Sequence, residues 1–450
     1  MSGDDISGPY SLSGADRSRP QGSGARQAWL VAVLTTVYTL NFVDRGALNL
    51  IVQPIKEDLH VTDLQMSYLL GLSFVTLYSL CSIPAGYVAD IVSRRKMIGI
   101  AVFFWSIMQA LCGFAGSYWQ LFAGRVGLGV GEAALPPAAY SLLRDGVEPK
   151  YRGRAFSIYQ MGPLLGAGVG AIVGGVLFGA ASHGGFKGLP LLGHMRPWQI
   201  VILAPGLFGV LVSMLLLTVR EPPRDAPVDR ADLPGFGETL RYVWKHGRLY
   251  APILGVTTVL ALATGWNAWL ATALIRIWGL SPAVIGGVTG PMSLILNPIA
   301  YVTVGVLMDR FTTPRRPDGR LWVAIVGTVL NVPASMAVLL APSIPLMWIA
   351  LGASILITGA GQVAIAAIVA EVTPGRLIGK VTSLQFLVGN ILGLAMGPTL
   401  FALVAETFFT GKRAIASSML VCYPAIAAVT VALMIVTALE LRRFKFAQAG

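Results

Sequence analysis

Twelve long apolar segments constrain the fold of this chain more than any other feature. An α-helix needs about 20 apolar residues to cross the ~30 Å hydrocarbon core of a bilayer. The segments comprise residues 29–52, 64–89, 97–115, 119–143, 154–181 and 198–219, then 249–277, 283–308, 321–340, 345–370, 378–404 and 414–441. Because 55% of the 450 residues are hydrophobic and only 12% are charged, a water-soluble fold could not bury this apolar surface. We therefore predict an all-α integral membrane protein with twelve transmembrane helices.

The net charge of +12 is spread over the short gaps between the apolar segments. If alternate gaps lie on opposite sides of the membrane, one side holds 25 of the 33 Lys and Arg residues and the other side holds six. Cytoplasmic loops carry such an excess of basic residues, so both termini are predicted to be cytoplasmic. With no compact basic domain, we expect no nucleic-acid partner.

The longest polar connection, residues 221–248, divides the chain into two pseudo-symmetric six-helix bundles. We predict a disordered cytoplasmic tail at 1–28, bundles at 29–220 and 249–441 joined by a cytoplasmic linker at 221–248, and a second tail at 442–450. A short pattern repeats between the halves: Gly86 to Asp90 followed by Arg94 and Arg95 resembles Gly305 to Arg310 followed by Arg315 and Arg316. Same-orientation repeats of this kind are typical of paired transporter halves.

Two apolar segments contain charged residues, Asp44 and Arg45 in the first and Arg125 and Glu132 in the fourth. A charge near the bilayer centre costs at least ~2.5–3.5 kcal/mol, so such residues usually face a bundle interior and serve function. Arg125 and Glu132 share one helix face about 10.5 Å apart. That distance is too long for a direct pair, but it suits a ligand or a second helix between them.

We predict different roles for the two carboxylates and the two arginines. A carboxylate whose neighbouring cation moves away during a conformational cycle can take up or release a proton, so Asp44 and Glu132 are the candidates for proton coupling. The guanidinium groups of Arg45 and Arg125 match an anionic head group such as phosphate. The alternative is that the four residues only neutralise one another and hold the first and fourth helices together.

Several motifs resemble those of the major facilitator superfamily over essentially the whole chain. They are the loop motif Gly86-x-x-x-Asp90 with Arg94 and Arg95, the helix-four motif from Arg125 to Ala133, and Gly162-Pro163-x-x-Gly166 with Gly170 and Gly174. Asn41 to Arg45, Gly129 to Ala133 and Tyr151 to Ala155 resemble the Spinster branch, as a bacterial homologue would. This resemblance implies a transporter of the bacterial inner membrane that moves a lysophospholipid or a sphingosine-1-phosphate-like lipid, with protons as the coupling ion.

Further site residues follow from loop position and from the seventh segment. Asp90, Arg94 and Arg95 are predicted to form a cytoplasmic gate, with Asp309, Arg310 and Glu371 as its counterpart in the second half. Trp266, Asn267 and Trp269 could line an amphipathic substrate cavity, although membrane tryptophans are equally often interface anchors or packing residues.

The sequence contains no signature of an enzyme. No nucleophile–base cluster is visible, the four histidines fall in loops, and no phosphate-cradling Gly-Lys-Ser/Thr loop is present. We expect neither a metal site nor a cofactor, and we expect a monomer. The predicted function is secondary transport of an amphipathic lipid phosphate, and the alternative is proton-coupled transport of a small organic anion such as a sugar acid. A channel or an uncoupled lipid scramblase also stays open at this point.

Overall fold

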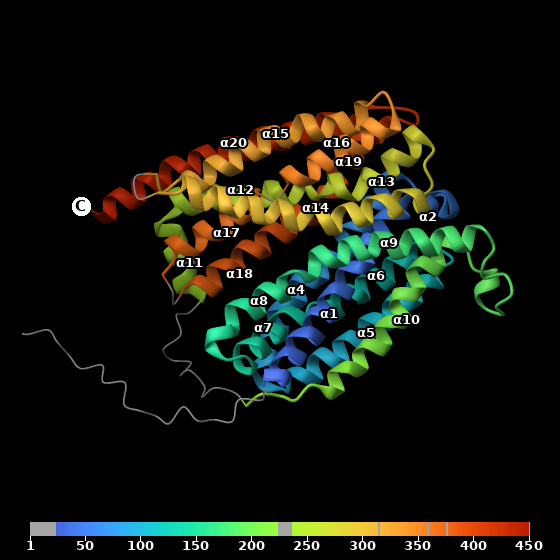
Figure 1. Ribbon diagram of the computed structural model, residues 1–450, viewed down its shortest axis with the longest axis horizontal. Coiled ribbons are helices and arrows are strands. Elements are labelled where there is room, and N and C mark those ends of the chain that lie inside the picture. Colours follow the sequence, from blue (N-terminus) through green and yellow to red (C-terminus); the bar gives the residue numbers. More distant parts are fainter. Residues whose placement is uncertain (1–23, 224–235, 314–315, 359, 375–376, 450) are drawn as a thin grey trace, which may run out of the picture.

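A computed structural model describes residues 24–223, 236–313, 316–358, 360–374 and 377–449. Most of the predicted N-terminal tail, the central part of the predicted linker and Arg315 lie outside these residues. The chain folds into two helical bundles, and Figure 1 shows the N-terminal bundle below the C-terminal one.

The first bundle contains the helices up to Thr218. They are α1 Gly24–Leu50, α2 Val52–Leu59, α3 Asp63–Leu70, α4 Leu72–Ile91, α5 Arg94–Gly113, α6 Tyr118–Glu132, α7 Leu135–Gly146, α8 Arg152–Gln160, α9 Gly162–Ser182 and α10 Pro197–Thr218, with short 3-10 turns at Pro149–Tyr151 and Leu192–His194. The second bundle comprises α11 Phe236–Lys245, α12 Gly247–Leu262, α13 Thr264–Trp278, α14 Pro282–Phe311, α15 Gly319–Leu340, α16 Ile344–Ile357, α17 Ala360–Val372, α18 Ile378–Val388, the π-helical η4 Gly389–Leu394, α19 Gly397–Phe408 and α20 Ala414–Ala449.

The predicted fold class is confirmed, because all twelve apolar segments are helical and form two bundles. Within the described ranges, ten helical stretches are long and apolar enough to cross a membrane on composition alone. The two other segments of that length are α1 and the consecutive α6 and α7, which carry the intramembrane charges.

Several of the segments are interrupted rather than continuous, which hydropathy did not predict. The second segment breaks at Gly71, between α3 and α4. A Cβ atom on Gly71 would lie 2.3 Å from the carbonyl oxygen of Ala395, which follows η4 in the other half. The break therefore occurs where the backbones of the two halves approach each other closely.

Helix α9 presents glycines to two neighbours. On one side, a Cβ on Gly170 would lie 2.4 Å from the Val43 carbonyl oxygen of α1. On the other side, a Cβ on Gly175 would lie 3.1 Å from the Cα of Gly286 in α14. These glycines let α9 pack tightly between α1 of its own half and α14 of the other half, which run beside it in Figure 1.

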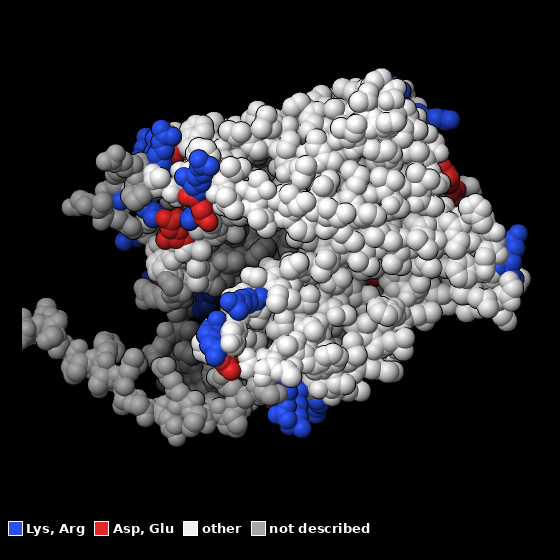
Figure 2. Space-filling model, viewed as in Figure 1, with Lys and Arg blue, Asp and Glu red and all other residues white. Residues whose placement is uncertain are grey.

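The two halves are closed together at one end and apart at the other. At the closed end, near α2 and the start of α3, one core combines residues of both halves, among them Ile51, Met66, Trp269 and Phe401. At the open end, Figure 2 shows a hollow between the halves, with both basic and acidic side chains near its rim. The two halves are therefore open to one side only.

Candidate functional site

The intramembrane charges meet between α1 and α6. Arg45 donates a hydrogen bond from Nη2 to Glu132 Oε2 at 2.8 Å, so the pair joins these helices. The Glu132 side chain is fully buried, whereas that of Arg45 keeps 23% of its surface exposed. Glu132 therefore pairs with Arg45 of another helix rather than with Arg125 of its own.

Asp44 and Arg125 are buried beside this pair but are less completely satisfied. Both lie close enough to Glu132 and Arg45 to interact electrostatically. Asp44 Oδ1 and Arg125 Nε receive no hydrogen-bond partner from the described residues. Since an incompletely paired buried charge is costly, these two groups can gain most from an incoming ligand or proton.

Helix α4 occupies the space between Arg125 and Glu132. Gly129 lies between them on the same face of α6, and a Cβ there would be 2.5 Å from the carbonyl oxygen of Phe74. The Phe74 ring lies against both guanidinium groups, 4.5 Å from Arg45 Cζ and 5.5 Å from Arg125 Cζ. Of the two arrangements that the spacing suits, a ligand or a second helix between the charges, the structure has the helix, and cation–π contacts hold both arginines.

Four tyrosines lie beside this cluster toward the open end, and sequence reasoning missed them. Tyr38 stacks on Tyr159 with ring centroids 4.5 Å apart, and Tyr140 meets Tyr159 edge-on at 5.7 Å. Tyr78 stacks on Phe74 at 5.3 Å. A signal was present, because Tyr38 precedes Arg45 by seven residues and so shares its helix face. The tyrosines give the approach to the charges an amphipathic, aromatic wall.

The predicted gate residues Arg94 and Arg95 bind within the first half. Buried Arg94 donates from Nε to Glu221 at 2.9 Å and pairs with Asp145 at the end of α7. The Arg95 backbone N–H donates to the other oxygen of Glu221 at 2.9 Å. Burial opposes ionisation of Glu221, but the hydrogen bonds from these residues and Ser93 outweigh it and lower the pKa of that carboxyl. These contacts tie the ends of α5, α7 and α10 together.

The second half contains a similar arrangement with one unexpected member. Glu371 at the end of α17 pairs with Arg320 at the start of α15, with 2.9 Å between Nη1 and Oε2, and with Lys445 of α20. Arg320 thus corresponds by position to Arg94. Asp309 and Arg310 are exposed on the last turn of α14, and Asp90 is exposed on the last turn of α4. The gate role of all six predicted residues stays a prediction.

The tryptophans of α13 lie in the closed-end core. Trp269 is fully buried and donates its indole N–H to the Pro398 carbonyl at 2.9 Å. Trp266 packs against Tyr423 with centroids 4.8 Å apart, and Asn267 is exposed. In this conformation both tryptophans are packing residues, and their contact with substrate stays a prediction.

A cluster of ionic contacts joins the two halves at the closed end. Arg276 of α13 donates two hydrogen bonds to Asp63 of α3, at 2.6 and 2.8 Å, and one to Gln53 at 2.8 Å. Lys56 also pairs with Asp63 at 2.6 Å, and Glu406 of α19 accepts the Leu64 backbone N–H at 2.9 Å. We call these residues the closed-end latch. Sequence reasoning missed it, although Arg276 and Lys56 were two of only six cations predicted on that side.

Comparison with known proteins agrees with this architecture. The family model described as Major Facilitator Superfamily matches residues 34–317. The chain belongs to the Major Facilitator Superfamily. The crystal structure of a bacterial homolog to human lysosomal transporter Spinster, inward-facing and unoccupied, superimposes with a TM-score of 0.77 at 27% identity, covering 95% of this chain and 98% of that one. The protein is therefore a Spinster-like transporter, as its motifs predicted.

Two curated relatives indicate the breadth of the family around this transporter. An MFS-type efflux pump of Mycolicibacterium smegmatis is 28% identical over 70% of this chain and 70% of its own length. A probable L-galactonate transporter of Escherichia coli is 24% identical over 64% of this chain and 61% of its own length. Both names describe membrane transport, and only the second names a cargo.

Proposed function

We propose that this transporter is a proton-coupled carrier of an amphipathic lipid phosphate, resembling a lysophospholipid or sphingosine-1-phosphate, and that it works by alternating access. The observation that carries the proposal is the cluster of Asp44, Arg45, Arg125 and Glu132, buried between α1 and α6 with the Arg45 side chain partly exposed. Neither cation is needed for packing alone, since an apolar residue of similar volume would fill the same space at no electrostatic cost.

The four charged residues have different roles in this proposal. Arg125 binds the phosphate, and Arg45 exchanges between Glu132 and the same anion. When Arg45 leaves Glu132, that carboxylate lies buried without its cation and takes up a proton. Asp44, adjacent to Arg45 in sequence, is the second proton acceptor. Binding of the cargo anion and uptake of the proton thereby favour one another.

The aromatic wall supports a cargo with both polar and apolar parts. The phenol groups of Tyr38, Tyr78 and Tyr140 offer hydrogen bonds beside ring faces that suit an acyl chain. In the opposite conformation, when the closed-end core separates, Trp266 and Trp269 contact the acyl chain and the Asn267 amide contacts the head group.

The open end faces the cytoplasm in this proposal, because most of the basic loop residues lie there. The structure then corresponds to an inward-facing state of a multi-pass protein in a bacterial inner membrane. Opening toward the other side breaks the closed-end latch while α9 and α14 stay in contact as the pivot. One chain holds both bundles, so the proposed functional unit is a monomer.

A small organic anion is the second candidate, favoured by the likeness to the galactonate transporter. A guanidinium fork binds a carboxylate as well as a phosphate, so the arginines do not decide between the two.

Proteoliposomes with an imposed pH gradient separate these cargoes. A labelled lysophosphatidic acid and labelled galactonate are each tested with wild type, Arg125→Ala and the matched surface variant Arg154→Ala. We expect saturable, gradient-sensitive lipid flux that Arg125→Ala abolishes and Arg154→Ala preserves. Flux of galactonate without lipid movement would reject the lipid cargo and keep the carrier. Lipid movement that is insensitive to the gradient would indicate an uncoupled scramblase.

A further inference from the structure

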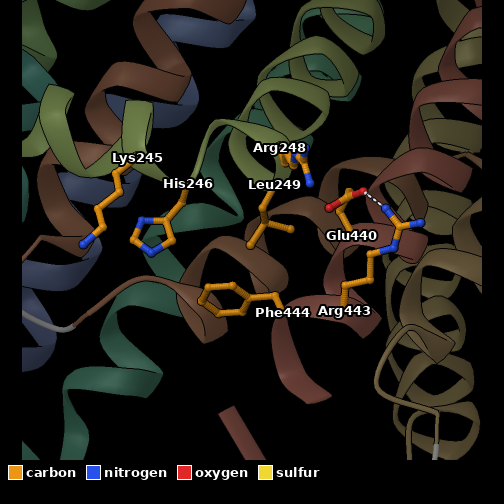
Figure 3. Close-up of a pocket in the computed structure, with 7 residues that line it drawn as sticks. All are labelled: Lys245, His246, Arg248, Leu249, Glu440, Arg443 and Phe444. Carbon is orange, nitrogen blue, oxygen red and sulfur yellow. Dashed lines mark hydrogen bonds and ion pairs between the residues drawn. The ribbon is translucent and has the colours of Figure 1, made fainter. Parts of the chain in front are cut away.

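A second charged hollow lies at the open end of the second half, away from the central cluster. It is a pocket of about 290 Å³ lined by Lys245, His246, Arg248, Leu249, Glu440, Arg443 and Phe444. These residues come from the end of α11, the start of α12 and the end of α20. Figure 3 shows His246, Leu249 and Phe444 between Lys245 on one side and Arg248 with the Glu440–Arg443 pair on the other.

The pocket carries an excess of positive charge. Glu440 is compensated by Arg443, whose Nη1 lies 2.6 Å from Oε1. Among the described residues, no carboxylate lies within ion-pairing distance of Lys245 or Arg248. Two cations without a neutralising partner therefore flank the apolar side chains of Leu249 and Phe444, one on each side (Figure 3). Cations that lack a carboxylate partner and lie beside apolar side chains can recognise phosphate groups.

The neighbouring helix α11 has the character of a membrane-interface helix. Thr239 is buried against the bundle, and Tyr242 donates its hydroxyl toward the Val372 carbonyl at 3.4 Å. The opposite face exposes Leu240 and Trp244, the latter to 88%. An amphipathic helix with exposed tryptophan and basic residues is typical of segments that lie in the head-group layer. The pocket opens at the end of this helix.

We propose that this pocket binds a phosphate-bearing anion, held by Lys245 and Arg248 above Leu249 and Phe444. An anionic phospholipid of the adjacent leaflet and a soluble organic phosphate share this chemistry. The pocket is separate from the transport site and does not depend on the identity of the cargo. A bound phosphate bridges α11, α12 and α20 at the edge of the open end.

The binding test uses the full-length transporter in detergent and native mass spectrometry with dioleoyl phosphatidic acid. The pocket variant Lys245→Gln/Arg248→Gln is compared with Lys96→Gln/Arg154→Gln, which removes the same charge from exposed positions in the first half. Arg125→Ala reports binding at the central cluster, and Arg248→Lys keeps the pocket charge. Melting in detergent confirms that each variant is folded. Glycerol 3-phosphate is added as a competitor.

We expect the pocket variant to bind phosphatidic acid at least roughly tenfold more weakly, because each lost charge-assisted contact is worth about that factor. The control pair, Arg125→Ala and Arg248→Lys should retain binding. Competition by glycerol 3-phosphate at similar concentrations would identify a soluble phosphate as the ligand, and its absence would identify the lipid. Equal loss in the pocket and control pairs, or loss in Arg125→Ala alone, would overturn the proposal.

Discussion

Replacement of Gly170 by alanine tests whether the packing of α9 positions the charged site. The new Cβ would lie 2.4 Å from the Val43 carbonyl oxygen and 3.0 Å from its Cα. These are backbone atoms, so α1 itself must move by about 1 Å to restore a normal contact. Asp44 and Arg45 follow Val43 directly, and the 2.8 Å bond from Arg45 to Glu132 moves with them.

Two opposing effects set the magnitude of this change. Helix propensity favours alanine over glycine by about 1 kcal/mol. Overpacking in a tight contact costs about 1–3 kcal/mol, so the variant should be less stable by up to about 2 kcal/mol. At Gly305 a Cβ would meet no atom within 4 Å, so Gly305→Ala is the matched control and should not lose stability.

The assay is thermal unfolding in detergent together with cargo transport in proteoliposomes. We expect Gly170→Ala to melt at a lower temperature and to transport more slowly, while Gly305→Ala keeps both properties. A Gly170→Ala protein as stable and as active as Gly305→Ala would refute the argument that this close approach positions Asp44 and Arg45.

Three further predictions concern the ends of the bundles and the closed-end core. Arg276→Ala removes three hydrogen bonds of the closed-end latch, and each hydrogen bond to a charged group is worth about 1.5–3 kcal/mol. The closed end should therefore open more often, and cysteines placed there should react at least tenfold faster with thiol reagents. Arg413→Ala is the control. The pKa of Glu221 is lower in the folded protein than in the unfolded chain, where it is about 4.3. The ionised carboxylate therefore stabilises the fold fully at a pH above about 4.3, and this stabilisation is lost as the pH falls through the pKa of the folded state. The difference in melting temperature between wild type and Glu221→Gln should therefore be largest at pH 7 and should decrease in acid. An equal difference at pH 3 would contradict this linkage. Trp269→Phe leaves the buried Pro398 carbonyl without its hydrogen-bond donor and should lower the free energy of unfolding by about 1–3 kcal/mol. Thermal unfolding measures this loss, with Trp266→Phe as the control.

Much of the architecture followed from hydropathy and loop charge. Hydropathy reports burial in lipid, which sets the twelve segments, and the long polar connection divides them into two bundles, whereas the side of insertion predicted from loop charge stays a prediction. Hydropathy and loop charge do not report where a helix breaks, because the break at Gly71 depends on contact with Ala395 more than 300 residues away. The π-helical turn at Gly389–Leu394 was not predicted either.

The sequence predicted which charged residues form the site, but it did not predict which of them form ion pairs. Charged residues in apolar segments identified Asp44, Arg45, Arg125 and Glu132, because their cost in lipid is large wherever they point. Spacing along one helix could not show that Arg45 pairs with Glu132, since that distance depends on how α1 and α6 pack. Arg320 was missed for the same reason, because its match to Arg94 depends on helix ends rather than on loop motifs.

The most direct measurement of the central claim compares two transport modes in Asp44→Asn and Glu132→Gln. In proteoliposomes, pH-gradient-driven accumulation requires proton movement, whereas exchange of labelled for unlabelled cargo at equal pH does not. We predict that both variants keep exchange and lose accumulation, because the amide preserves shape and cannot carry the coupling proton. Accumulation that survives in both variants, or loss of exchange together with accumulation, would contradict the coupling role and indicate that the charges only hold α1 and α6 together.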